Sequence, residues 1–210
     1  MNQNSNKVKW YPRLFTDDMV RKILSDRKTA TRWPLRKQPV EEVAKRVGEW
    51  VWEDVAGNVF HAPVRPGDVI WGRETWAHRE GGPVYDAVGR VMDSFESETV
   101  YRASCPKGKG PWKPSIHMPR RYTRILLRVT GVKLVQVQDI SEEEAQAEGV
   151  APSTKQIVKF GRGMFIVFAR QNFARLWDSL YSARGLGWDA NPWVWAATFR
   201  RISKEEALNG

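Results

Sequence analysis

Apolar residues recur at helical spacing in two segments of the chain, which predicts helices over residues 17–25 and 168–182. In the first segment they stand at positions 19, 20, 23 and 24, and in the second at 173, 176, 177 and 180. Thr16 precedes the first helix and is suited to cap its N-terminus. The first helix should stop at a cationic segment that contains almost no apolar side chain.

A third, shorter helix is expected to begin after Ser141. Ser141 and Glu144 have the spacing of a capping box, and the acidic residues of this first turn complement the helix dipole. Gly149 supplies a C-cap and should end the helix. A further short helix is predicted over residues 41–47, within a segment rich in proline and charge.

Alternation of apolar and polar residues predicts a larger number of strands. Residues 49–53 and 59–61 form a hairpin around a loop that contains Gly57. A Pro-Gly-Asp turn at residues 66–68 precedes the next strand, and Gly131 interrupts the longest β-like run with a bulge or a bend. Besides the hairpin, strands are expected at residues 69–76, 99–102, 124–138 and 193–202.

These elements predict an α+β fold in a single domain over residues 1–210. Strands outnumber helices and do not alternate with them in regular β-α-β units, which favours a mixed, mostly antiparallel sheet curled into a barrel, with two or three helices on its rim. Residues 1–9 and 203–210 are expected to be flexible tails. Residues 77–98 and 105–114 are expected to be inserted loops.

Composition excludes several classes of protein. The chain has no run of about 18 apolar residues, so no membrane span is expected. Its polar N-terminus lacks the apolar stretch of a signal peptide, and its one cysteine, Cys105, fits a reducing cytoplasm. His61, His78, His117 and Cys105 lack the spacing of metal ligands, so neither a metal nor another cofactor is predicted.

The net charge of +10 indicates an affinity for polyanions, nucleic acid ahead of a membrane surface. The alternative is a basic protein whose charge serves only its solubility. The chain also has 11 tryptophans. Several of them, such as Trp33, Trp76 and Trp112, lie close to cations or prolines in the sequence, an arrangement suited to base stacking with phosphate contact. The alternative is that most of these large residues fill an irregular core.

Residues 26–32, Asp-Arg-Lys-Thr-Ala-Thr-Arg, are the most informative segment for chemistry. A tight turn there would bring the Lys28 amine close to the Thr31 hydroxyl, and an amine beside a hydroxyl can activate an oxygen nucleophile. The alternative is a helix-terminating turn in which Lys28 bonds carbonyl groups and Thr31 bonds locally. Spacing alone favours this structural interpretation.

Several motifs follow one another in a recognisable order. The Lys-Thr-x-Thr turn after a helix is followed by Pro-Gly-Asp before a strand, and by Ile-Ser-Glu-Glu-Glu-Ala-x-x-Glu-Gly after the longest strand. Longer motifs stand at residues 73–76, 115–120 and 188–193. This ordered set covers most of residues 12–202 and resembles the ASCH family, in particular a subgroup common in phages and prophages.

The resemblance implies a small PUA-like β-barrel related to RNA-binding domains. It also implies an activity, because some ASCH proteins are amidohydrolases that remove an acyl group from the exocyclic amine of a modified cytidine. Lys28, Thr31 and Glu148 match their catalytic positions. In such a reaction Thr31 would attack the acyl carbon and a neutral Lys28 would accept its proton. Glu148 would either deliver a proton to the departing nitrogen or position a water molecule.

Other residues are candidates for binding rather than chemistry. Arg32 and Arg73 can polarise a carbonyl group or hold a phosphate, and Glu74 is either a pocket residue or a structural ion pair with Arg73 or Arg120. The full set of substrate-binding candidates is Arg27, Arg32, Arg73, Glu74, Trp76, His117 and Arg120. The basic loop contributes the nucleic-acid-binding candidates Lys107, Lys109, Trp112 and Lys113, unless it is only a solvated loop.

Three functions remain open at this point. The first is an amidohydrolase that acts on an N-acylated nucleobase. The second is a binding module that recognises RNA, a modified nucleoside or DNA without chemistry. The third is a ribonuclease, which the basic charge permits, although no acidic cluster suited to a two-metal mechanism is evident.

Overall fold

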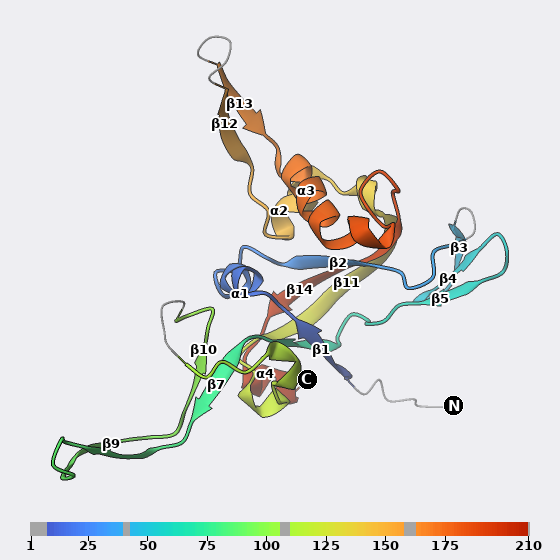
Figure 1. The fold of residues 1–210 in the computed structure, drawn as a ribbon. Coiled ribbons are helices and arrows are strands. Elements are labelled where there is room, and N and C mark those ends of the chain that lie inside the picture. The colour runs from blue at the N-terminus through green and yellow to red at the C-terminus, as the bar shows by residue number, and fades with distance from the viewer. Residues whose placement is uncertain (1–7, 40–42, 106–109, 158–162, 210) are drawn as a thin grey trace, which may run out of the picture.

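The computed structural model describes residues 8–39, 43–105, 110–157 and 163–209. Its centre is a five-stranded sheet in the order β1-β6-β11-β14-β2 (Figure 1). Strands β1 and β6 are parallel, and the other neighbours are antiparallel, so the fold is α+β with a mixed, mostly antiparallel sheet. The strands are β1 (Trp10–Leu14), β6 (Val69–Arg73), β11 (Leu126–Gln136), β14 (Trp193–Arg201) and β2 (Ala30–Pro34).

The central sheet is curled but not closed. Its two edge strands, β1 and β2, share no backbone pairing within the described residues. They nevertheless approach each other, because the Arg13 guanidinium carbon of β1 lies 4.3 Å from the centre of the Trp33 ring of β2. The predicted barrel is therefore an open sheet whose edges meet through side chains.

The concave side of the sheet holds the main apolar core. Alternate residues of β11 and β14, such as Leu127, Val129, Trp195 and Ala197, face this core. The sheet register shifts between Val129 and Gly131, so the bulge predicted at Gly131 is confirmed.

Four α-helices lie around the sheet in the described residues: α1 (Asp17–Leu24), α2 (Glu142–Ala147), α3 (Ala169–Tyr181) and α4 (Lys204–Asn209). Three match the predicted helices, and Thr16 caps α1 as expected. The capping box of Ser141 and Glu144 is also confirmed. Helices α2 and α3 lie together beside the sheet (Figure 1). They enclose a second apolar cluster on the face of the sheet opposite the main core.

Hairpins project from the central sheet (Figure 1). The strands outside the central sheet are β3 (Val43–Gly48), β4 (Val51–Asp54), β5 (Val59–His61), β7 (Trp76–Arg79), β8 (Gly82–Tyr85), β9 (Val91–Phe95), β10 (Glu98–Tyr101), β12 (Ser153–Ile157) and β13 (Gly163–Val167). Four 3₁₀ turns complete the described elements: η1 (Ser115–His117), η2 (Arg120–Tyr122), η3 (Val137–Asp139) and η4 (Ser182–Arg184).

Some local expectations were wrong. The helix predicted over residues 41–47 is strand β3 from Val43 onward, because pairing with β4 overrides the weak helical pattern. The insert at residues 77–98 is not a loop, since β8 and β9 pair within it. The tail expected from residue 203 folds into α4, which is held by the burial of Ala207. None of the helices in the described ranges is both long and apolar enough to cross a membrane.

The close approach of β6 to Ile125 generates the first testable prediction. A Cβ atom added at Gly72 would lie 2.7 Å from the Ile125 Cβ, whereas one added at Gly82 meets no atom within 4 Å. Gly72→Ala should therefore lower the free energy of unfolding by about 1–3 kcal/mol, because the core must shift to accept it. Urea denaturation of this variant beside Gly82→Ala measures the difference, and equal effects would contradict the packing described here.

Candidate functional site

Lys28 and Glu148 meet in a buried ion pair, although 120 residues separate them. The Lys28 Nζ lies 2.8 Å from the Glu148 Oε2, and the two residues are 3% and 8% exposed. Their backbones also form an isolated antiparallel bridge. The structure thus brings together two of the three residues that the ASCH resemblance implies for catalysis.

The turns at both ends of this contact are set by the local sequence. Asp26 has a φ of 55°, a left-handed conformation that Asp tolerates better than most residues, and it turns the chain after α1. Gly149 has a φ of 82°, and a Cβ atom there would lie 3.2 Å from the Lys28 Cβ. Gly149 therefore both ends α2 and allows the Lys28 backbone to approach.

All three donors of the Lys28 ammonium group are in use. They reach the Glu148 Oε2 at 2.8 Å, the Glu148 carbonyl at 3.0 Å and the Ala30 carbonyl at 2.8 Å. A protonated lysine has three donors, so this geometry is that of a saturated ammonium ion. The arrangement anchors α2 to the open edge of β2.

Arg32 extends the ion pair into a network. It donates to the Glu148 Oε1 at 3.3 Å and to the Glu144 Oε2 at 2.5 Å. Its buried Nε has no hydrogen-bond partner in the described residues. Lys133 lies 3.6 Å from the second oxygen of Glu144. The network pairs cations with carboxylates, so it holds little excess charge for an anionic ligand.

Thr31 lies on the opposite face of β2 from Arg32. It is paired in register with Ala197, whose side chain belongs to the main core. Side chains alternate along a strand, so Thr31 faces the concave side while Arg32 faces α2. No hydrogen bond joins the Thr31 hydroxyl to Lys28 or Glu148 among the described residues. The amine and the carboxylate are therefore adjacent, and the hydroxyl is on the other face.

Glu74 is fully buried and has a partner that the sequence did not indicate. Arg124 binds both of its carboxylate oxygens, each at 2.9 Å. The Arg124 guanidinium carbon also lies 4.1 Å from the centre of the Tyr101 ring. Glu74 is thus held in a two-pronged ion pair with Arg124, rather than with Arg73 or Arg120.

The remaining substrate-binding candidates do not gather around Lys28. Arg73 donates to the Ile116 carbonyl, and Arg120 lies 5.0 Å from the Trp10 ring. The exposed Arg27 bonds Ser25, and His117 is also exposed. Trp76 is buried beneath Lys113, whose Nζ lies 5.1 Å from its ring.

The basic loop is only partly described. Lys107 and Lys109 lie outside the described residues. Lys113 pairs its backbone with Trp76, and Trp112 packs close to Gly110. A group of three or more His, Cys, Asp and Glu side chains able to hold a metal ion is not found in the part of the chain that the structure describes.

The most promising cavity was missed by the sequence reasoning. It lies at one end of the curled sheet, has a volume of about 520 Å³, and is called the Arg13 pocket below. No carboxylate side chain is among its described lining residues. The lining includes cations, aromatic rings and an amide from β1, β2, β5, β14 and the segments next to β2 and β5: Arg13, Trp33, Arg36, Lys37, Asn58, Phe60, His61 and Trp195.

Arg13 is the exceptional residue of this pocket. It is half-buried, and its Nε is buried without a hydrogen-bond partner in the described residues. Burial lowers the pKa of its guanidinium below the usual range, the nearby Arg36 adds to this effect, and Tyr181 opposes it. Its described contact is the stack on Trp33. An anion bound beside Arg13 would relieve this uncompensated charge.

A short relay positions a second cation at the same pocket. Asn58 donates to the Asp54 carboxylate at 2.8 Å, and its carbonyl oxygen accepts from the Lys37 Nζ at 2.8 Å. Lys37 is therefore oriented, and in this relay it uses one of the three donors of its ammonium group. The run Trp33-Pro34-Leu35-Arg36-Lys37 was the sequence signal for this pocket, since it sets cations close to an aromatic residue.

Comparisons with known proteins do not identify the chain. No family model matches it, and no curated protein matches it. Among solved structures it is similar to the crystal structure of protein EF3133 from Enterococcus faecalis V583, described by the family model DUF984. The identity is 13%, over 94% of this chain and 82% of that chain, with a TM-score of 0.42. A similarity of that size carries no argument about function.

The buried ion pair leads to a prediction about stability. Lys28→Met should lower the free energy of unfolding by about 3–5 kcal/mol, because it removes a partner of a buried carboxylate. Lys22→Met is the matched control: Lys22 is partly exposed and pairs at 2.6 Å with the exposed Asp18 of α1, so the loss of this pair should cost about 1 kcal/mol or less. Urea denaturation measures both. Similar costs for the two variants would mean that the Lys28–Glu148 contact is not buried in solution.

Proposed function

We propose that this protein binds single-stranded nucleic acid, with RNA as the first candidate, through the Arg13 pocket. The observation that carries the proposal is the Arg13 guanidinium, which is half-buried beside Arg36 and has no carboxylate partner in the described residues. A backbone phosphate is the anion that suits a guanidinium best, because two parallel hydrogen bonds can form.

The aromatic residues of the pocket support a nucleotide rather than a bare phosphate. Trp33 is half-buried in the pocket and is in contact with Arg13, so a phosphate held by Arg13 places its attached base against aromatic surface. Stacking of a base on an aromatic side chain contributes about 1–3 kcal/mol and tolerates any base. The volume of about 520 Å³ also lies within the range of small-molecule sites.

The charges of the pocket support a polymer with several phosphates. Arg36 and Lys37 are exposed at its rim and extend the positive surface away from Arg13. The net charge of the whole chain, +10, favours the same class of partner and speeds its association. The proposal requires no chemistry at the pocket.

Binding should depend on these cations and on salt. With a labelled RNA of about 10 nucleotides, Arg13→Gln should weaken binding about 10-fold, as expected for one lost hydrogen-bonded charge contact. The slope of log affinity against log salt should fall by about 0.7 for each lost phosphate contact, so by about 1.4 for Arg36→Gln with Lys37→Gln. Fluorescence anisotropy over a salt series measures both quantities.

Arg175→Gln is the matched control, because Arg175 is exposed on α3 and does not line the pocket. A DNA strand of the same sequence, measured in parallel, distinguishes the two polymers. If Arg13→Gln binds as tightly as Arg175→Gln, with the same salt slope, the Arg13 pocket does not hold the phosphates.

A second candidate function is hydrolysis of a cytidine acylated on its exocyclic amine. The observation in its favour is the contact of 2.8 Å between the Lys28 amine and the Glu148 carboxylate, two of the three groups the ASCH resemblance implies. In this reaction Thr31 attacks the acyl carbon and the amide bond breaks, which releases free cytidine; water then hydrolyses the ester on Thr31 and releases a carboxylic acid. The hydroxyl of Thr31 must then reach the acyl carbon from the other face of β2.

Chromatography of acylated cytidine incubated with the protein tests this candidate. On this hypothesis cytidine is released, and Thr31→Val abolishes the release while its melting temperature stays near that of the parent protein, because the two side chains have nearly the same shape. Release that persists in Thr31→Val would remove the threonine from the mechanism. A parent protein that releases no cytidine would exclude the activity.

A further inference from the structure

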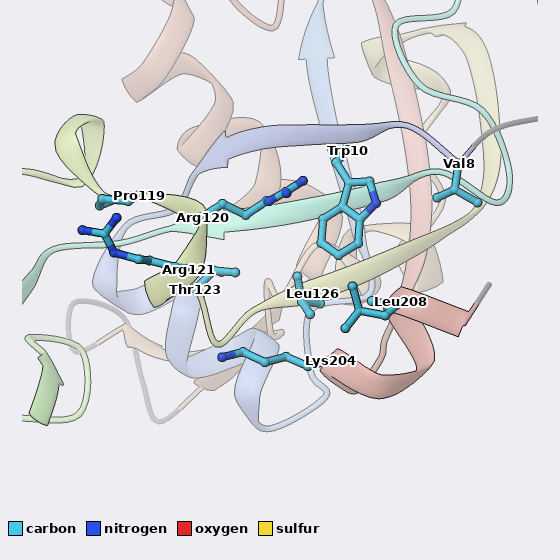
Figure 2. Close-up of a pocket in the computed structure, with 10 residues that line it drawn as sticks. Val8, Trp10, Pro119, Arg120, Arg121, Thr123, Leu126, Lys204 and Leu208 are labelled. Atoms are coloured by element: carbon cyan, nitrogen blue, oxygen red, sulfur yellow. The ribbon is translucent and has the colours of Figure 1, made fainter.

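A second and larger cavity lies on the convex side of the sheet, where β1, η2, β11 and α4 meet (Figure 2). Its volume is about 860 Å³. Figure 2 shows Trp10 at its centre, with Leu126 and Leu208 beside the ring and Arg120 next to it. These residues define what we call the Trp10 groove. Its walls include Lys204 from α4.

The polar side chains of the groove are almost all donors. Arg120, Arg121 and Lys204 contribute positive charge, and the described lining contains no carboxylate. Arg120 and Arg121 stack on aromatic rings, at 5.0 Å from Trp10 and 4.7 Å from Tyr122. Thr123 supplies the one hydroxyl in the described lining, and it already donates to the Gly72 carbonyl at 2.8 Å. The groove therefore favours a ligand that only accepts hydrogen bonds.

The floor of the groove is apolar, so the part of the ligand that lies on it should also be apolar. Trp10 and Leu126 belong to a small apolar cluster that α4 partly covers. Leu208, at the end of α4, remains 78% exposed at the edge of the groove. A ligand with an apolar body would cover Leu208 and Trp10 and remove apolar surface from water.

Helix α4 is held against the sheet by one buried side chain and by contacts of Glu206. Ala207 is buried against the sheet, Glu206 accepts a hydrogen bond from Arg200, and the Glu206 carbonyl accepts one from Arg128 at 3.0 Å. The Arg200 hydrogen bond lowers the pKa of the Glu206 carboxyl below its usual range. The pair therefore contributes stability at neutral pH and loses it as the pH falls through that lowered pKa.

We propose that the Trp10 groove binds an organic anion with an apolar body, a carboxylate or sulfonate on an acyl chain or aromatic ring. The acidic group contacts Arg120, which lies beside Trp10 (Figure 2), and Lys204 adds positive charge at another side of the groove. The apolar body lies on Trp10, Leu126 and Leu208. The volume of about 860 Å³ fits the range of about 300–1,000 Å³ for such ligands. The groove offers cations but few groups able to read the edges of a base, which distinguishes it from the Arg13 pocket.

The two sites share no lining residue, although both use β1. Trp10 and Arg13 lie on opposite faces of this strand, because side chains alternate along it. The proposal for the Trp10 groove therefore does not rest on nucleic-acid binding.

The probe for the test is anilinonaphthalene sulfonate, an aromatic sulfonate that fluoresces when it leaves water. Titration of the full chain should give saturable binding to one site, and decanoate should displace the dye whereas decanol should not. Arg120→Gln with Lys204→Gln should weaken dye binding about 10-fold, as expected for the loss of one charged contact or more. Leu208→Asp places a carboxylate at the exposed edge and should abolish it, with no change in melting temperature.

Arg175→Gln is again the control and should bind the dye like the parent protein. Dye binding that is equal in all variants, or displacement by decanol as efficient as by decanoate, would overturn the proposal. Displacement by a nucleoside monophosphate but not by decanoate would assign the groove to nucleotides instead. The Arg120 and Lys204 variants, measured in parallel, should bind RNA as tightly as the parent protein. A negative result for the Trp10 groove can therefore be distinguished from a negative result for the Arg13 pocket.

Discussion

The alternation of side chains on the two edge strands decides which residues line each candidate site. The sheet is curled, so each strand has a concave face toward the core and a convex face toward helices or solvent. On β2 this rule separates Thr31 from Arg32, and on β1 it separates Arg13 from Trp10. Neighbouring residues thus serve different surfaces. The groups of each candidate site are brought together by the fold and not by their spacing in the sequence.

Buried cations in the described residues either have a carboxylate partner or lack one, and this difference points to the candidate sites. Lys28, Arg32, Glu148 and the Glu74–Arg124 pair are compensated, because each cation faces a carboxylate within hydrogen-bond distance or close to it. Such pairs specify one packing of helices against the sheet and leave little charge for a ligand. Arg13 is of the other kind, since its described contact is an aromatic ring. Uncompensated charge at a cavity indicates binding more directly than burial does.

Much of the fold could be predicted from the sequence, where local signals are strong. The helices at 17–24 and 169–181, the capping box at Ser141 and the bulge at Gly131 all follow from local chemistry. Strand β1 could not be predicted, because Pro12 argues against a strand unless that strand lies at an edge. Strand β2 was hidden for another reason: its buried Arg32 is a charged residue, and its burial depends on Glu144 and Glu148 more than 100 residues away.

The candidate sites were less accessible to sequence reasoning than the fold. The pairing of Lys28 with Glu148 came from the ASCH resemblance, since no local pattern joins residues 120 positions apart. The Arg13 pocket draws on β1, β2, β5 and β14, and the Trp10 groove on both ends of the chain, so each needs the folded sheet to exist.

Composition does contribute at this level, because a net charge of +10 implies that some cations lack partners. The structure shows where two groups of these cations lie. One group is beside Trp33 on the concave face of the sheet, and the other is beside Trp10 on the convex face. An aromatic ring next to an unpaired cation suits a ligand that carries a negative charge and also has a flat or apolar part. The hydrogen-bonding groups around each ring then determine whether a nucleotide or a simpler organic anion fits better.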